Sequence, residues 1–369
     1  MYRQYDCLAL FSGGLDSLLA CKLIQAQGLR VLGLHFLSPF FGNQDLISHW
    51  QKLHNIDLLP VDISKEFIQL LLQGPEYGLG KGLNPCVDCK ILMLQMSKGM
   101  LEQFQAGFII SGEVLGQRPM SQRKDALNLI PKKSGTKEIL LRPLSASNLR
   151  PTFMELSGKV DRSRLMDFQG RGRKQQLSLA KEMQLQEIPT PAGGCLLTEP
   201  ETVKRFWPVL KKVPNPGPED FALSKVGRQY WAGDHWLVIG RNQQDNQELL
   251  NLIQKGDLLF KLLDVPGPIA VARQLHRQWS AEAVHSAASF MLRFSNKTKK
   301  YLQPIRIRVG APEGNIQEIQ VKPQPDGQGL SWKEVSWQEF EQDKQAGLIP
   351  NQACGSHNRE KNLTNASNG

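Results

Sequence analysis

The sequence has no apolar run long enough to cross a membrane, and it has few cysteines for its size. A membrane-spanning helix needs about 20 consecutive apolar residues, and no such run occurs in the 369 residues, although 40% of them are hydrophobic. The first residues show no signal-peptide pattern. Six cysteines are too few for a disulfide framework in a chain of this length. We therefore expect a soluble, cytoplasmic protein of two or three domains with reduced thiols.

The chain has fewer acidic than basic residues, and this difference is concentrated in one stretch. The chain has 45 Lys and Arg against 35 Asp and Glu, a net charge of +10. Residues 118–181 alone contain 15 basic and 5 acidic residues. Such a stretch is either a solvated basic face or a track for the phosphates of a nucleic acid, and composition cannot decide between the two.

Short apolar segments alternate with amphipathic segments through the first half of the chain. The predicted strands are residues 7–11, 31–36, 58–62 and 108–111, and the predicted helices are residues 16–27 and 89–104. This alternation is typical of βαβ units around a parallel sheet, so the predicted fold class is α/β.

The pattern of apolar and proline residues in the sequence changes near residue 200. Three prolines lie between Val213 and Asp220 and indicate a break in regular structure. Beyond them, short strand-like segments (236–239, 269–273, 305–309 and 316–321) and two helical segments (246–253 and 281–292) predict a smaller α+β domain. The expected divisions are a first domain at 1–205, a Pro-rich linker at 206–220, a second domain at 221–325, and a polar, partly disordered tail at 326–369.

A glycine-rich turn follows the first predicted strand. The segment Ser12-Gly-Gly-Leu-Asp-Ser17 leads directly into a helix, where backbone N–H groups and the helix N-terminus can bind phosphate. The turn lacks the lysine of a Walker A loop and carries Asp16 instead, so we expect Mg²⁺ to neutralise the phosphates there. The alternative is an ordinary tight turn whose serines cap the helix.

This hexapeptide resembles the PP-loop of ATP pyrophosphatases, and the resemblance covers roughly residues 5–200. The family adenylates a substrate and releases pyrophosphate. The residues that would hold the pyrophosphate part of ATP and its Mg²⁺ are Ser12, Gly13, Gly14, Asp16 and Ser17. By the same resemblance, His35 and Phe36 would lie near the adenine.

A second segment, Ser111-Gly-Glu-Val-Leu-Gly-Gln117, follows the strand at 108–111 and should emerge at the carboxyl edge of the sheet. It resembles the Gly-Glu-x-x-Gly-Gln segment of the tRNA 4-thiouridine synthetase family, although the residues after it match only in part. We expect Ser111, Gly112 and Gln117 at the ATP site. The basic residues expected along an RNA backbone are Arg118, Arg123, Arg171, Arg173 and Lys174.

Three cysteines are placed where they can converge. Cys86 and Cys89 are one helical turn apart, and Cys195 follows a loop rich in proline and glycine. Three thiolates could hold an iron–sulfur cluster, hold zinc with a fourth ligand, or relay a persulfide. The favoured prediction is a [4Fe-4S] cluster, because the arrangement resembles that of PP-loop enzymes that thiolate tRNA. The predicted catalytic residues are then these three cysteines and Asp16.

The second domain resembles the RNA-binding domain of NFACT proteins. The resemblance lies in Leu237-Val-Ile-Gly-Arg-Asn242 and in the Val-Pro-Gly-Pro segment of Asp264–Arg273. It implies that Arg241, Asn242, Arg273 and Arg277 face RNA. The alternative is that these polar residues only cap turns.

Together, these features predict ATP-dependent thiolation of a tRNA uridine through an adenylated base. The implied cofactors are ATP, Mg²⁺ and a [4Fe-4S] cluster, and the implied partners are tRNA and a sulfur donor, either a cysteine desulfurase system or free sulfide. Two alternatives stay open: a PP-loop ligase acting on a small substrate, and an ATP-regulated RNA-binding factor with structural zinc. The sequence also leaves open the oligomeric state, a homodimer included, and which uridine oxygen is replaced.

Overall fold

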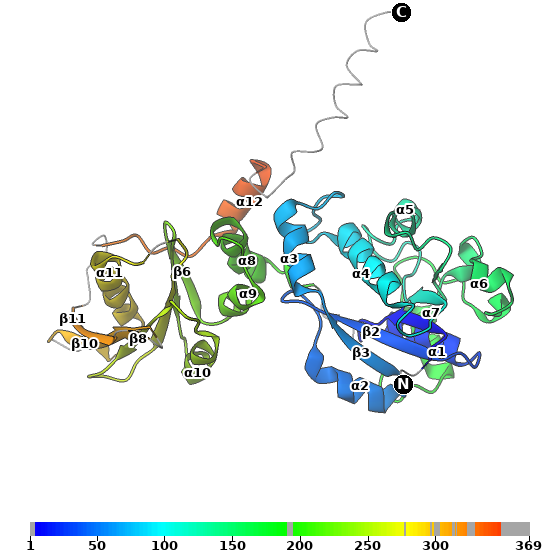
Figure 1. Cartoon of the computed structure of the whole chain (residues 1–369), viewed down its shortest axis with the longest axis horizontal. Coiled ribbons are helices and arrows are strands. Elements are labelled where there is room, and N and C mark those ends of the chain that lie inside the picture. The colour runs from blue at the N-terminus through cyan, green and yellow to red at the C-terminus, as the bar shows by residue number, and fades with distance from the viewer. Residues whose placement is uncertain are drawn as a thin grey trace, which may run out of the picture. The chain divides into compact units, whose positions relative to one another are not determined.

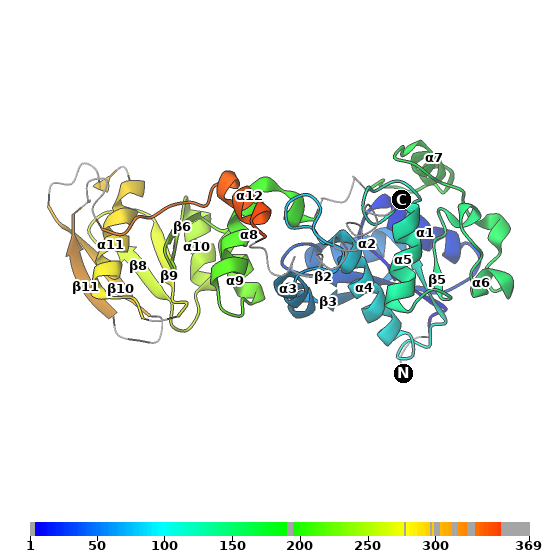
Figure 2. The same cartoon turned by 90° about the horizontal axis from the view of Figure 1, so that it is seen from above.

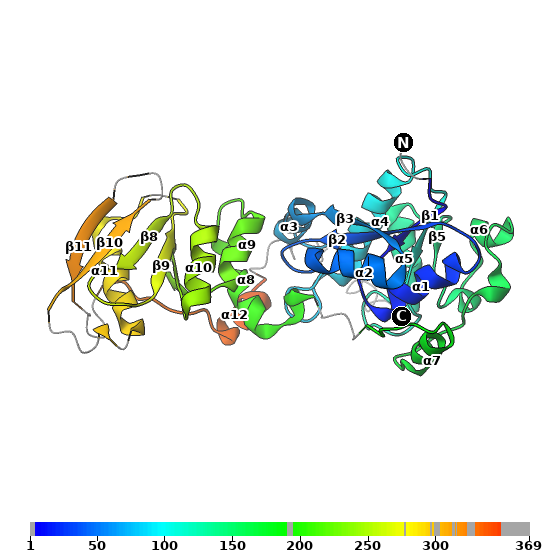
Figure 3. The same cartoon turned by 90° about the horizontal axis from the view of Figure 1, so that it is seen from below.

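The chain forms two compact units, which the computed structural model divides between Glu199 and Pro200 (Figure 1). The described residues are 4–189, 195–276, 278–295, 297–298, 303–311, 314, 316–322 and 329–347. Figures 2 and 3 show the same elements from above and below.

The first unit is built on a five-stranded parallel sheet of order β3-β2-β1-β4-β5. Its strands are β1 Cys7–Leu10, β2 Val31–Leu37, β3 Asp57–Asp62, β4 Phe108–Ser111 and β5 Leu140–Leu141. Cys7 is in register with Val31 on one side and with Phe108 on the other. Every residue of β1 is buried, so both faces of the sheet are covered. The predicted parallel α/β fold is confirmed.

Helices and two apolar clusters complete the first unit. The helices are α1 Leu15–Gln25, α2 Ile47–His54, α3 Ser64–Gln73, α4 Cys86–Met100, α5 Lys124–Ser134, α6 Phe153–Leu156 and α7 Lys174–Glu182, with short 3-10 helices η1 Gln44–Leu46, η2 Ala146–Asn148, η3 Arg162–Arg164 and η4 Leu196–Thr198. One cluster joins β1, β2 and β4 to α1. In the other, Leu15, Leu19 and Leu23 of α1 pack on Leu179 and Ala180 of α7.

The second unit contains a six-stranded antiparallel sheet of order β11-β10-β8-β9-β7-β6. The strands are β6 Arg228–Ala232, β7 His235–Ile239, β8 Leu258–Leu262, β9 Ile269–Arg273, β10 Ile305–Gly310 and β11 Ile316–Val321. The helices are α8 Pro200–Lys212, α9 Pro218–Lys225, α10 Gln243–Leu252, α11 Ala281–Met291 and α12 Trp337–Gln345, with the 3-10 helix η5 Leu292–Phe294. The apolar face of α11 packs on the sheet through Ala283, Ala287 and Met291.

The structure differs from the sequence prediction around the proline-rich segment. Residues 206–220, expected as a linker, contain the end of α8 and the start of α9. Pro218 opens α9, where the missing N–H of proline costs no hydrogen bond, and Pro208 lies inside α8. Part of the expected polar tail forms α12, and Lys333 pairs with Trp231 of β6. Residues 348–369 of that tail lie outside the described residues.

Candidate functional site

The turn after β1 is held in one conformation by a glycine and two serines. Gly13 has a φ of +79°, and a Cβ there would lie 2.4 Å from the ring of Trp50, so the position requires glycine. Ser17 Oγ donates to the carbonyl of Gly14 at 2.8 Å and accepts from Ser12 N–H at 3.3 Å. Gly14 is the N-cap of α1, so the free N–H groups of that helix begin at this turn.

The two segments singled out in the sequence meet at this turn. β1 and β4 are neighbours, with Leu10 in register with Ser111. Gly112 comes directly after β4 and lies against the start of α1. A Cβ at this position would lie 2.4 Å from the main-chain carbonyl of Asp16. The glycine therefore allows the main chain after β4 to contact the first turn of α1.

A cavity of about 280 Å³ opens beside the turn at the carboxyl edge of the sheet. Its lining includes Ser12, Asp16, Ser17, His35, Phe36, Gly112, Arg118, Cys86, Cys89 and Cys195. The phosphate-type turn, the two residues expected near adenine and all three predicted cysteines thus face one space. This convergence comes from β1, β2 and β4 and from the start of α4, elements that are far apart in the sequence.

Asp16 has one engaged and one unpaired carboxylate oxygen. Gln117 Nε2 donates to Oδ2 at 3.1 Å, whereas Oδ1 is buried without a hydrogen-bond partner in the described structure. Burial raises the pKa of Asp16, and the hydrogen bond from Gln117 and the charge of Arg173 oppose that rise. An unpaired carboxylate oxygen beside a phosphate-type turn fits a Mg²⁺ ligand.

His35 is a neutral, fully bonded residue of the cavity wall. The backbone N–H of Asn43 donates to Nε2 at 3.0 Å, so Nδ1 carries the proton and donates to the carbonyl of Phe11, also at 3.0 Å. Burial lowers the pKa of His35. Because both ring nitrogens are engaged, His35 shapes the cavity and does not serve as an acid or base.

A buried ion pair beside the cavity was not predicted as part of the site. Arg142 Nε donates to Glu113 Oε2 at 2.9 Å, and both side chains are nearly inaccessible. Burial alone would raise the pKa of Glu113, but the charges of Arg142 and Lys90 outweigh it and lower that pKa. Ser111, expected at ATP, instead donates to Glu113 at 3.0 Å. The ion pair fixes the segment that carries Gly112.

Main-chain contacts bring the cysteine segments together. Asp88, between Cys86 and Cys89, accepts from the N–H groups of Glu76 at 2.9 Å and Tyr77 at 3.2 Å, which ties the first turn of α4 to the preceding loop. Next to Cys195, Leu196 N–H donates to the carbonyl of Phe40 at 3.0 Å. In the same segment, the carbonyl of Leu197 accepts from Leu83 N–H at 2.9 Å.

The cysteines lie near one another, but they do not form a ready metal site. Burial raises the pKa of Cys89, and a charge on Cys195 would raise it further. Burial also raises the pKa of Cys195 to about 12. Among the residues that the structure describes, no three His, Cys, Asp or Glu side chains are grouped closely enough to hold a metal ion. The iron–sulfur cluster therefore stays a prediction.

The basic residues predicted to contact RNA in the first unit divide into two groups. Arg118, Arg171 and Lys174 are exposed, and Arg118 also lines the cavity. Arg123 is exposed but pairs with Asp125 at 3.2 Å. Arg173 is only partly exposed, and its charge acts on Asp16 of the turn.

In the second unit, the residues predicted to face RNA have structural roles. Arg241 binds Asp245 at 2.6 Å, and the Asn242 side chain caps α10. Arg273 is only 4% exposed and holds two carboxylates, Asp220 at 2.6 Å and Asp257 at 2.9 Å. Arg273 is therefore too buried to face RNA, whereas Arg241 and Asn242 are exposed. Arg277 lies outside the described residues.

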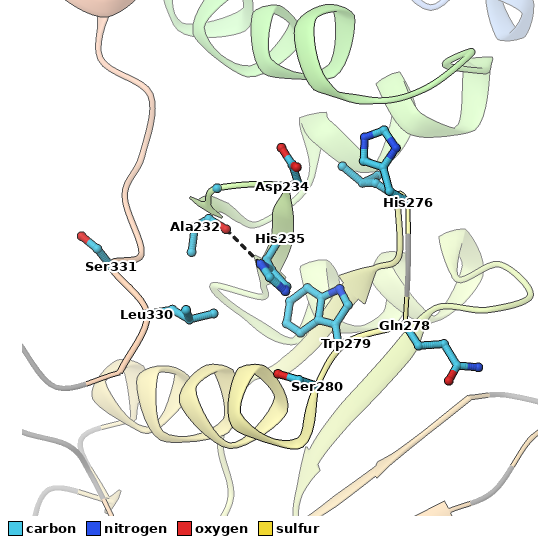
Figure 4. Close-up of a pocket in the computed structure, with 11 residues that line it drawn as sticks. Ala232, Asp234, His235, His276, Gln278, Trp279, Ser280, Leu330 and Ser331 are labelled. Carbon is cyan, nitrogen blue, oxygen red and sulfur yellow. Dashed lines mark hydrogen bonds between the residues drawn. The ribbon is translucent and has the colours of Figure 1, made fainter.

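The second unit has its own cavity of about 550 Å³, which the sequence did not predict (Figure 4). It lies between the β6–β7 turn, the segment before α11, and residues 330–331. His235 meets Trp279 edge to face, with ring centroids 4.8 Å apart, and His235 Nδ1 donates to the carbonyl of Ala232 at 3.1 Å.

Helices long and apolar enough to cross a membrane are absent from the part of the chain that the structure describes.

Comparisons with known proteins match both units. Residues 2–148 match the family described as thiamine biosynthesis protein (ThiI), and residues 227–333 match the NFACT protein RNA binding domain. Both resemblances predicted from the sequence are thereby confirmed. A curated relative, the tRNA-specific 2-thiouridylase MnmA of Petrotoga mobilis, is 30% identical over 129 residues. That match covers 29% of this chain and 35% of the relative, so the chain spans about a third of the relative's length.

Solved structures give weaker similarities. A predicted subunit of tRNA methyltransferase from Methanocaldococcus jannaschii is 14% identical with a TM-score of 0.31, covering 48% of this chain and 76% of that chain. The C-terminal part of the fibronectin/fibrinogen-binding protein from Streptococcus suis is 15% identical with a TM-score of 0.23, covering 42% and 70%. The NMN synthetase of Francisella tularensis is 14% identical with a TM-score of 0.25, covering 52% and 90%.

Proposed function

We propose that the protein is an ATP-dependent tRNA sulfurtransferase that thiolates a uridine. The observation that carries the proposal is the single cavity in which the phosphate-type turn and three cysteines meet. The match to the ThiI family, the 2-thiouridylase relative and the RNA-binding family match in the second unit support it. The proposed setting is the cytoplasm.

The turn and α1 would bind the phosphates of ATP. Ser12, Asp16 and Ser17 line the cavity. The N–H groups at the start of α1 and the serine hydroxyls would stabilise the negative charge of departing pyrophosphate. Asp16 Oδ1 is the oxygen placed to hold Mg²⁺, which would neutralise phosphate charge when bound. Arg118 is exposed at the cavity and would bind a phosphate of ATP or of the RNA substrate.

The reaction consists of two displacements. The carbonyl oxygen of the uracil ring attacks the α-phosphorus of ATP, and pyrophosphate leaves. Sulfide from the sulfur donor, brought to the cavity that the cysteines line, then attacks the same ring carbon. The carbon–oxygen bond breaks, and the oxygen departs with AMP. Adenylation is needed because an unactivated carbonyl oxygen is a poor leaving group, whereas AMP is a good one.

The first test measures pyrophosphate release in the presence and absence of tRNA. Wild-type protein should release pyrophosphate with tRNA, and Asp16→Asn should lower the rate by about 10²-fold or more because the metal ligand is lost. The matched control is Asp45→Asn, the same change at an exposed site in the first unit. tRNA binding should be unchanged in both variants. Undiminished release by Asp16→Asn would exclude the assigned role of the turn.

A second test addresses the sulfur step. Mass spectrometry of tRNA nucleosides should show that Cys86→Ser, Cys89→Ser and Cys195→Ser each abolish the thiolated product while pyrophosphate release continues. Cys354→Ser, in the C-terminal segment, is the control. Iron and zinc measured after anaerobic purification distinguish a cluster from structural zinc, and a metal-free active protein would favour the persulfide relay. Thiolation by all three cavity variants would refute the cysteine role.

A further inference from the structure

A continuous row of aromatic rings extends from the 550 Å³ cavity across the second unit. Trp279 stacks on Trp332 at a centroid distance of 5.7 Å, and Trp332 stacks on Phe290 at 6.0 Å. Phe290 in turn contacts Tyr230 at 4.8 Å and Phe294 at 5.4 Å. We call these five residues the aromatic row. Its members come from β6, α11, the segments on either side of α11, and the segment after residue 329.

The aromatic row lies at the edge of the core and carries arginines. Tyr230, Phe290, Phe294 and Trp332 are each partly exposed, whereas Trp279 is buried and lines the cavity. The guanidinium of Arg228 lies over the Phe294 ring at 5.2 Å, and that of Arg293 lies over Phe290 at 5.4 Å. A surface that only closed the core would not need two cations stacked on its rings.

The cavity end of the row has a different chemistry. Asp234, Gln278 and Ser280 lie around the rings of His235 and Trp279, as Figure 4 shows. The Asp234 carboxylate makes this space unsuitable for a phosphate, but it can accept hydrogen bonds from the amino groups of a nucleobase. The volume falls within the roughly 300–1,000 Å³ of pockets that hold small organic groups.

Partly exposed rings with arginines beside them are suited to nucleic acid whose bases are unpaired. Bases stack on aromatic rings and on guanidinium planes, and the arginines neutralise the backbone phosphates. Paired RNA hides the faces of its bases, so a purely phosphate-binding surface would gain nothing from five rings. The arrangement therefore favours single-stranded RNA over a duplex.

We propose that the aromatic row binds an unpaired stretch of RNA, with one base entering the cavity beside His235 and Trp279. The proposal rests on the proposed RNA substrate. It adds to the second unit an RNA-binding surface in which the buried Arg273 takes no part.

Binding of labelled RNA to the full chain tests this proposal. The probes are a short single-stranded RNA, the same strand in a duplex, and the same strand with abasic sites. Arg228→Gln, Arg228→Lys and His235→Ala should each weaken single-strand binding by about tenfold, because stacked bases contribute strongly to such complexes. Lysine keeps the charge but loses the planar guanidinium, so it separates stacking from attraction to phosphate.

The matched control is Lys261→Gln, which removes one charge from the same unit. Lys261 is exposed on β8, and its neighbours Phe260 and Leu262 face the α11 side, so Lys261 lies on the opposite face of the sheet. The affinity of Lys261→Gln for single-stranded RNA should stay within about twofold of that of wild type. Thermal unfolding of each variant identifies any loss of affinity that comes from misfolding.

The outcomes separate this proposal from the proposed function. If the wild-type chain binds no RNA, the RNA partner itself is wrong. If wild type binds RNA but Arg228→Gln and His235→Ala bind equally well, only the aromatic row is refuted. The proposal would also be overturned if Arg228→Lys bound single-stranded RNA as tightly as wild type, or if wild type bound the duplex or the abasic strand as tightly as the intact single strand. Either result would mean that the protein contacts only the phosphates and not the bases.

Discussion

Replacing Gly112 with alanine tests how the two segments of the nucleotide site fit together. The added Cβ would lie 2.4 Å from the carbonyl carbon and oxygen of Asp16 and 2.5 Å from the nitrogen of Ser17. These are main-chain atoms, so no side-chain rotation can relieve the overlap. Because β4 is fixed by its pairing with β1, the first turn of α1 must move until the atoms reach ordinary contact at 3.4 Å or more.

The size of the effect follows from this overlap. Overpacking of a close-packed interior costs about 1–3 kcal/mol. In a unit of this size each kcal/mol lowers the midpoint of thermal unfolding by about 2–4 °C, so Gly112→Ala should lower it by about 2–12 °C. ATP binding should suffer more, because a displacement of about 1 Å in a positioning element can cost 10²-fold.

Calorimetry provides both measurements, and the chain offers a matched control. Gly99 lies in α4, where an added Cβ meets nothing within 4 Å. Gly99→Ala should therefore stabilise the protein by about 0.5–1 kcal/mol, since alanine is the better helix former, and should leave ATP affinity unchanged. If Gly112→Ala binds ATP as wild type does, with an unchanged unfolding midpoint, the contact between Gly112 and α1 is not needed for the site.

Two further predictions concern stability. Burial lowers the pKa of His35, so below about pH 6.5 the unfolded chain binds more protons than the folded one. In urea unfolding, the free energy of unfolding should therefore decrease as the pH is lowered, by at most about 1.4 kcal/mol per pH unit for this group. If His35→Asn shows the same dependence of unfolding free energy on pH as wild type, this prediction is contradicted. Arg273→Leu should destabilise the second unit by about 3–5 kcal/mol because Asp220 and Asp257 lose their buried cation. Arg241→Gln, at a more exposed pair, should cost under about 1 kcal/mol, and equal losses in the two arginine variants would refute the distinction.

The parallel sheet could be predicted because its central strands are continuous apolar runs. β1 and β4 are buried on both faces and lead into glycine-containing turns, so their own residues are enough to predict where they lie in the chain. The two-residue strand β5 has no such signal, and neither has α2, whose sequence is polar over most of its length. These elements depend on tertiary contacts more than on their own residues.

The candidate site shows the same division between local and non-local information. The turn at Ser12–Ser17 and the segment after β4 could be placed together, because carboxyl ends of neighbouring parallel strands share an edge. The Glu113–Arg142 pair could not, because nothing in either segment indicates which charge it meets. Ser111 gives an example: nothing in its own segment indicates that its hydroxyl donates to the buried Glu113 carboxylate.

Strand order explains why Arg273, which the sequence predicted to face RNA, is buried. Arg273 ends β9, an interior strand, where the flanking elements bring two carboxylates to the guanidinium. Arg228 begins β6, an edge strand, and its guanidinium lies over a ring that is itself partly exposed. Both are arginines at strand ends, and only the order of strands in the sheet separates a buried ion pair from a partly exposed cation. That order is set by pairings between distant segments, so the exposure of each arginine could be found only after the sheet was known.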